Sequence, residues 1–340
     1  MTTECVYRNR RAVQIENEHL RVTVLIEGGH IAEILHKATQ TNPLWTPGWP
    51  SIEPSSYEER LHPEYGLNAE SKLLAGIMGH NVCVDLFGGP SEDEAAAGVT
   101  VHGEASVLPY DIQSDGTTMR CVCTMPLSSM RFERTLTLDN ASEVRIDEAV
   151  ISESAWDRPI AWTQHVTLGP PFLERGRTAF ELTATRSRTY DGEFGTLFDR
   201  GVEFDWPQAP LRGGGVYDLR TYTELSSSAG FTTHLMDPAL ENASFHATSG
   251  ALVFGYRWKR EDFPWLGIWE ENCFRQSAPW NGTAITRGME FGVSPQAESR
   301  RAMIDRGSLF GVPGYRWLPA KGTLRASYSA FIGYTDDLLR

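Results

Sequence analysis

The sequence lacks the long apolar runs and most of the short motifs by which many protein classes are identified. No stretch of this 340-residue chain approaches the roughly 18 apolar residues of a membrane-spanning helix. It has no Gly-X-Ser-X-Gly elbow, no Walker loop and no dinucleotide-binding glycine fingerprint. No Cys-X-X-Cys or His-X-X-X-His pair supplies local metal-ligand spacing, so we expect neither a metal nor another cofactor. One alternative set of metal ligands is His80, His102 and His165, although nothing local requires it.

Cysteine and positive charge are also scarce. The five cysteines are odd in number and irregularly spaced, which is a poor disulfide framework. Cys121 and Cys123 lie two apart on a strand-like run and are expected to be small buried apolar side chains. The formal net charge of -13 argues against nucleic acid or an anionic membrane as a partner. No signal-peptide core follows Arg10 and Arg11, so we expect a cytoplasmic protein.

Helical periodicity is weak, and alternation of apolar and polar residues dominates the chain. Residues 22–27, 131–138 and 144–151 each alternate with a period of two, which is typical of half-buried strands. Short helical segments are expected only within 58–71 and 295–306. Glycine and proline fall mostly between the strand-like runs, and no low-complexity linker interrupts them. The pattern predicts an all-β fold, a large antiparallel β-sandwich with a curved sheet whose concave side holds a ligand.

Two acid–base residues stand opposite apolar faces in such runs. In residues 162–168, His165 lies on the face away from the apolar side chains, and Glu290 does the same in residues 288–294. Small neighbours on the Glu290 face leave room for a ligand. The alternative is a solvent-facing histidine and a surface glutamate, which a strand of a soluble protein also tolerates.

A third candidate is His102, in the strand-like run 101–104. Gly103 permits close backbone approach, and Glu104 is expected either to orient the imidazole or to bind a hydroxyl group. The run 264–274 places Trp269 and Glu271 on one face, a combination that suits the C–H surface and hydroxyl groups of a sugar. A histidine at a sheet edge and tryptophans in a core are the alternative interpretations.

Taken in order, these segments resemble the galactose mutarotase (aldose 1-epimerase) superfamily. Residues 101–104 are similar to its first histidine motif, residues 164–169 to its second, and residues 288–295 to the late strand that bears its catalytic glutamate. The match is diffuse, which indicates a divergent member. The family's Gly-Arg-X-X-Asn-Arg segment is replaced near residues 79–83, without arginine. The resemblance implies a single galactose mutarotase-like β-sandwich domain over residues 1–340.

The resemblance also implies a division of roles. His165 would be the general acid that protonates the sugar ring oxygen, Glu290 the general base that takes the anomeric proton, and His102 a polarising partner. The implied partner is a small-molecule carbohydrate, and the implied activity is interconversion of the anomers of a free sugar or sugar derivative. The expected substrate-binding residues are His80, Asn81, Asp237, Trp269 and Glu271.

Three other functions stay open from the sequence. A silent carbohydrate-binding or sensing protein would use the same fold without catalysis. A lyase or hydrolase would have reused the cleft. A phosphorylated sugar would need phosphate ligands, for which Arg257, Lys259 and Arg260 are candidates, although exposed basic side chains at a strand end are the simpler interpretation. The sequence does not define the oligomeric state.

Overall fold

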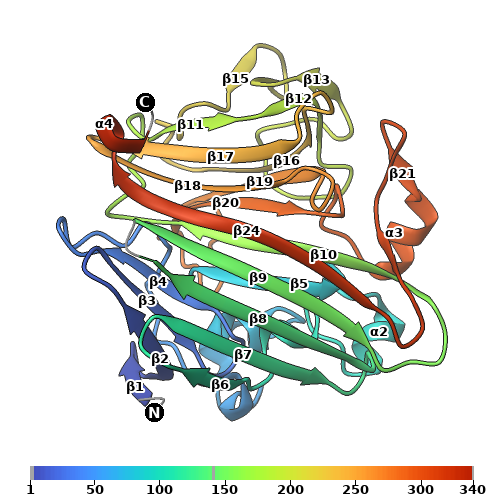
Figure 1. The fold of residues 1–340 in the computed structure, drawn as a ribbon. Helices are drawn as coiled ribbons and strands as arrows, with labels where there is room; N and C mark the ends of the chain where they lie inside the picture. Colours follow the sequence, from blue (N-terminus) through green and yellow to red (C-terminus); the bar gives the residue numbers. More distant parts are fainter. Residues whose placement is uncertain (1–3, 140–141, 339–340) are drawn as a thin grey trace.

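Two large antiparallel sheets packed face to face form the core of the protein (Figure 1). The structure is a computed structural model that describes residues 4–139 and 142–338. The larger sheet runs in the order β1-β2-β3-β4-β5-β10-β20-β19-β16-β12-β13, with β23 also paired to β10. The smaller sheet runs β11-β17-β18-β24-β9-β8-β7-β6. The all-β antiparallel sandwich that the sequence predicts is therefore confirmed.

The strands of the larger sheet are β1 (Glu4–Tyr7), β2 (Arg10–Glu16), β3 (Leu20–Leu25), β4 (Ile31–His36), β5 (His80–Asp85), β10 (Arg158–Leu168), β20 (Ile285–Gly292), β19 (Trp265–Asn272), β16 (Ser228–Met236), β12 (Ala184–Thr189), β13 (Glu203–Asp205) and β23 (Arg316–Leu318). Those of the smaller sheet are β11 (Ala179–Leu182), β17 (Asn242–Ser249), β18 (Leu252–Lys259), β24 (Thr323–Tyr334), β9 (Glu143–Ser152), β8 (Met130–Leu138), β7 (Thr118–Met125) and β6 (Asp111–Ser114). Two short ribbons pair β14 (Gln208–Pro210) with β15 (Val216–Asp218) and β21 (Ser308–Leu309) with β22 (Val312–Pro313).

The main hydrophobic core lies between the two sheets. Phe132 and Val150 of the smaller sheet and Trp162, Met289 and Phe291 of the larger one belong to a single buried cluster. Because strand side chains alternate, the residues between these core positions on β10 and β20 must face away from the smaller sheet. We call this side of the larger sheet its outer face. Cys121 and Cys123 are buried and unbridged, as expected.

Helices are short and lie at the margins; α2 and α3 occupy one edge of the sandwich in Figure 1. They are α1 (Ser71–Gly76), α2 (Glu92–Ala96), α3 (Arg300–Arg306) and α4 (Thr335–Leu338), with 3-10 turns η1 (Pro54–Ser56), η2 (Pro63–Tyr65) and η3 (Glu104–Ser106). The helical turns expected in 58–71 and 295–306 are present in part as η2 and α3. Within the described ranges, no helix is long and apolar enough to cross a membrane.

Residues 92–96 form a short helix that begins with a capping box, in which Ser91 and Glu94 satisfy each other's backbone N–H. One local prediction is wrong. Residues 101–104 form a tight turn in place of the expected strand. His102 has a φ of 66° and Gly103 a φ of 80°, and a Cβ on Gly103 would lie 2.2 Å from the Val84 carbonyl oxygen. A continuous strand cannot adopt this backbone.

Candidate active site

Strand register aligns the central polar residues in one row across the outer face. Asn81 of β5 pairs with His165 of β10, His165 pairs with Glu290 of β20, and Glu290 pairs with Gly267 of β19. Paired residues on neighbouring strands point to the same side and lie about 5 Å apart. The side chains of Asn81, His165 and Glu290 therefore stand next to one another, and Gly267 ends the row, where the Phe231 ring packs against it.

His165 and Glu290 are in direct contact. Nε2 of His165 lies 3.1 Å from Oε1 of Glu290, while Nδ1 of His165 lies 3.1 Å from the Thr167 hydroxyl. The relative orientation of the imidazole and the carboxylate is not that of a hydrogen bond. Glu290 Oε1 therefore has no hydrogen-bond partner among the described residues. A buried carboxylate oxygen without a partner is costly in free energy and typical of sites that bind or transform a ligand.

His102 joins this pair from the turn beside β5. Its ring centroid lies 4.6 Å from that of His165, and the Asn81 side-chain amide lies 3.1 Å from His102 Nδ1. The backbone of the turn is fixed because His102 N–H donates to Gly88 O and Val84 N–H donates to His102 O. The three residues that the sequence singles out as acid–base groups thus converge in one place.

Glycines on the outer face keep the carboxylate of Glu290 free. A Cβ on Gly288 would lie 2.4 Å from Glu290 Oε1. A Cβ on Gly267 would lie 2.7 Å from the Phe231 ring and 3.6 Å from Glu290 Oε2. Any side chain at Gly288 would therefore push the carboxylate out of the row.

His165 and Glu290 of this row line a cavity of about 260 Å³, just below the ~300–1,000 Å³ range of ligand pockets. Two apolar clusters flank it. The first is centred on α1 and contains Trp45, Leu73, Leu74, Ile77, Val101, Val107, Trp280 and Ala284. The second contains Cys83, Phe87, Ala161, Phe231 and Met303. Trp269 packs against both clusters, so it closes the cavity between them.

Arg275 is a cavity residue that the sequence patterns did not identify. Its guanidinium carbon lies 3.5 Å from the centre of the Trp280 ring. Its Nε donates to Glu271 Oε2 at 2.9 Å and its Nη1 donates to Glu70 at 3.2 Å. The i,i+4 spacing between Glu271 and Arg275 is the sequence feature that could have indicated their ion pair. Glu271 is fully buried and also accepts the backbone N–H of Phe274 and Arg275, so its role is to hold Arg275 and not to contact a ligand directly.

Burial sets the protonation of the three central groups. It raises the pKa of Glu290 well above its ordinary value and lowers the pKa of His165 to about 4. Burial and the neighbouring His165 hold the pKa of His102 well below the usual value. Desolvation disfavours every charged form here, so it favours a protonated Glu290 and neutral imidazoles.

The structure corrects two predicted sugar contacts. His80 pairs with Val166 and so faces the smaller sheet, where its ring nitrogens lie 3.0 Å from the Tyr256 hydroxyl and 3.0 Å from Gln164. Because it is on the opposite face from His102 and His165, the three histidines do not form one cluster. Asp237 follows the end of β16 and accepts the backbone N–H of Ala239, outside the cavity lining.

Other predicted roles also change. Glu104 accepts the backbone N–H groups of Leu127 and Ser128 and does not orient His102. Arg257 and Lys259 lie on β18 of the smaller sheet, away from the cavity, so they cannot bind a phosphate there. Trp269 lines the cavity, whereas Asn81 contacts His102 and is not among the residues that line it.

The fold resembles that of several solved structures. A Klebsiella pneumoniae protein with a provisional name as an aldose 1-epimerase matches with a TM-score of 0.67 and 12% identity over 95% of this chain and 79% of its own. A galactose mutarotase-like protein of Clostridium acetobutylicum matches with a TM-score of 0.63 and 12% identity over 98% of each chain. A galactose mutarotase related enzyme of Lactobacillus acidophilus matches with a TM-score of 0.59 and 12% identity over 95% of this chain and 98% of its own.

Comparison by sequence found no match. No protein-family model matches the chain, and no curated protein matches its sequence. At such low identity the structural likeness concerns the arrangement of strands and not the chemistry of the cavity. The protein has the galactose mutarotase-like fold, as the resemblance in its three polar segments predicts.

Proposed function

We propose that the protein is an aldose 1-epimerase-like enzyme that interconverts the anomers of a sugar. The observation that carries this proposal is the contact between His165 and Glu290, which lie 3.1 Å apart and both line the cavity. Ring opening of a sugar needs a base at the anomeric hydroxyl and an acid at the ring oxygen, two atoms bonded to the same carbon. An acid and a base held this close match that requirement.

The pair carries one proton between its two groups. Burial favours the proton on Glu290. When the hydroxyl groups of a sugar donate hydrogen bonds to the carboxylate, they stabilise its ionised form and the proton moves to His165. Glu290 then takes the anomeric proton while His165 protonates the ring oxygen, and the C1–O5 bond breaks to give the open-chain aldehyde. Rotation about C1–C2 and the reverse transfers close the ring on its other face and restore both groups.

His102 and Asn81 support the ring oxygen in this proposal. When the Asn81 amide donates to Nδ1 of His102, the neutral imidazole carries its proton on Nε2. That N–H is available to polarise the ring oxygen or a neighbouring hydroxyl. Asn81 itself does not line the cavity, so its part in the proposal is to orient His102. His102 is the polarising group and Asn81 its positioning residue.

The walls suit a sugar ring. Sugars present C–H faces that pack on aromatic rings, and Trp269 offers such a surface beside Glu290. The opposite wall, made by Leu73, Leu74 and Ile77, offers no hydrogen bonds from its side chains. We therefore expect a sugar that turns a face with few hydroxyl groups towards α1. The predicted cytoplasmic location is compatible with a soluble sugar substrate.

Anomer exchange measured by saturation-transfer NMR across a panel of aldoses tests the proposal. Acceleration over buffer that disappears in a folded His165→Asn variant supports it. If no sugar shows acceleration while calorimetry detects sugar binding, the protein is a carbohydrate-binding or sensing protein. New reducing ends or an unsaturated product from an oligosaccharide would instead identify a hydrolase or lyase.

A further inference from the structure

A second hollow adjoins the candidate active site on the outer face. It has a volume of about 320 Å³ and shares Tyr190, Glu193, Phe194 and Phe231 with the first cavity. The central row lies on β5, β10 and β20, whereas the second hollow lies over β16 and the end of β12, farther along the same sheet. The two hollows are therefore successive parts of one cleft.

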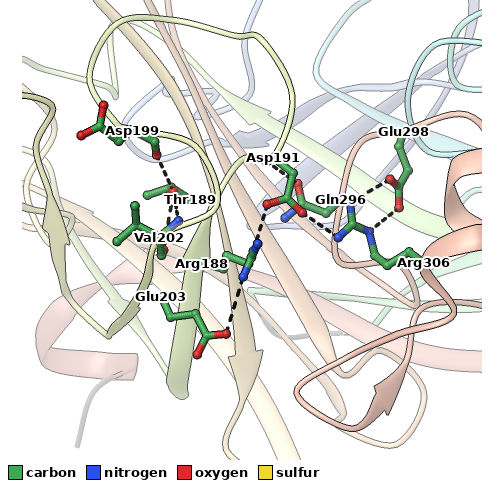
Figure 2. Close-up of polar contacts among 9 residues, drawn as sticks. All are labelled: Arg188, Thr189, Asp191, Asp199, Val202, Glu203, Gln296, Glu298 and Arg306. Carbon is green, nitrogen blue, oxygen red and sulfur yellow. Dashed lines mark hydrogen bonds and ion pairs between the residues drawn. The ribbon is translucent and has the colours of Figure 1, made fainter.

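The outer wall of the second hollow is the segment 190–202, which connects β12 to β13. Figure 2 shows how its base is closed: the Thr189 hydroxyl donates to Asp199 O at 2.6 Å, and Val202 N–H donates to the Thr189 hydroxyl at 2.8 Å. Arg188 and Arg306 both contact Asp191, at 2.9 and 2.6 Å. The base of the segment is thus anchored to β12 and to α3.

The middle of the segment is anchored to the sheet. Thr196 and Leu197 donate their backbone N–H groups to Ala229 O of β16, at 3.0 and 3.2 Å. The approach is so close that a Cβ on Gly195, whose φ is 72°, would lie 2.0 Å from the same oxygen. These contacts fix the segment at both its base and its middle, so the hollow it encloses is part of the fold.

The lining of this hollow combines aromatic surface with balanced charge. Phe194, Phe198 and Phe231 supply ring faces. Arg200 is paired with Glu193, and Arg212 lies 3.4 Å from Asp199 and donates to Phe198 O at 3.0 Å. Aromatic faces with donors and acceptors at the rim, and no excess of either charge, suit a neutral group rich in hydroxyls.

We propose that the second hollow binds a second glycosyl unit, so that the substrate is a disaccharide or longer oligosaccharide with its reducing-end unit beside His165 and Glu290. This inference rests on the proposed anomer exchange for its account of the first cavity. The second unit undergoes no chemical change. Its glycosidic bond stays intact while the reducing-end ring opens and closes.

Matched sugar pairs test the inference: glucose with cellobiose and with maltose, and N-acetylglucosamine with chitobiose. For at least one pair, kcat/KM for anomer exchange is expected to be tenfold or more higher for the disaccharide. In Arg200→Ala and Arg212→Ala variants the disaccharide-to-monosaccharide ratio is expected to fall towards one. Arg177→Ala is the matched control, because Arg177 is also exposed and ion-paired, with Glu174, but lines neither hollow. Ratios near one for every pair in the wild-type protein would overturn the inference.

Calorimetry with the same pairs on the Glu290→Gln variant separates this inference from the proposed activity. Tighter binding of a disaccharide without any exchange in the wild-type protein would support the second subsite and refute the proposed activity. Equal affinity for both members of every pair, with exchange of the monosaccharides intact, would refute the subsite alone. Absence of both exchange and a binding preference would refute both.

Discussion

Two buried carboxylates on neighbouring strands make a direct test of the proposed site. Glu290 and Glu270 are each 2–3% exposed, and burial raises the pKa of both. They face opposite sides of the larger sheet. Glu290 points into the cavity with an oxygen that lacks a partner among the described residues. Glu270 points towards the smaller sheet and accepts hydrogen bonds from the Tyr217 and Ser228 hydroxyls at 2.9 and 3.1 Å.

The two Glu→Gln substitutions should therefore have opposite effects. Glu290→Gln removes the base, for which a loss of about 10²–10⁴ in rate is usual, or about 3–5 kcal/mol of transition-state stabilisation. Its free energy of unfolding should change by less than about 1 kcal/mol, because no strong hydrogen bond is lost and burial already favours the protonated, neutral form of Glu290, for which a glutamine amide is a close substitute.

Glu270→Gln should keep exchange activity and lower stability. The charge of the buried Arg287 opposes the effect of burial on the pKa of Glu270. Arg287 lies at the paired position on β20, and its guanidinium has no hydrogen-bond partner among the described residues. Removing one charge of a buried pair leaves the other uncompensated, at a cost of about 3–5 kcal/mol.

Both variants are measured by saturation-transfer NMR with an exchanging sugar and by denaturant unfolding. Glu290 is not the base if Glu290→Gln retains more than a tenth of wild-type exchange. If the Glu290 variant loses as much stability as the Glu270 variant, Glu290 is a structural carboxylate.

Three further predictions follow from the same geometry. Exchange should show a bell-shaped pH profile, because His165 and Glu290 must share one proton: a second proton is bound as pH falls towards about 4, the pKa of His165, and the shared proton is lost above the raised pKa of Glu290. A flat profile from pH 4 to 9 would contradict this. Gly288→Ala should slow exchange roughly 10²-fold with native circular dichroism, since its Cβ displaces Glu290 Oε1; unchanged kinetics would show that the position of the carboxylate is unimportant. Burial lowers the pKa of His234 to about 3, so the folded state is favoured fully above the unfolded pKa near 6.5 and loses this stabilisation as pH falls. His234→Gln should therefore reduce the loss of unfolding free energy between pH 7 and 5 by about 2 kcal/mol. Denaturant titrations that show the same pH dependence for both proteins would refute this.

Placement of polar residues relative to apolar neighbours could be predicted for the regular strands. Alternation along β10 and β20 predicted that His165 and Glu290 face away from the core, and the structure places both on the outer face. The same rule failed for residues 101–104, because it presumes a strand. There the backbone of His102 has positive φ, and its side chain lines the cavity because it lies on a turn beside β5.

Adjacent residues show why sugar contacts were harder to predict. His80 and Asn81 are neighbours on β5, and both were expected to bind the substrate. Side chains of successive residues point to opposite faces, so Asn81 reaches His102 while His80 reaches Tyr256 between the sheets. Which of the two faces the cavity depends on the pairing of β5 with β10, and that register is not visible in a local pattern.

The sequence by itself determined the class of fold and the faces on which His165 and Glu290 lie, because both follow from a two-residue period that each strand carries within itself. Only the tertiary structure decided which other residues lie next to those faces. The contact of His165 with Glu290, the approach of His102, the hydrogen bond from Arg275 to Glu70 and the cleft beneath segment 190–202 all join residues far apart in the chain. They depend on strand register and loop anchoring, which arise only when the two sheets assemble.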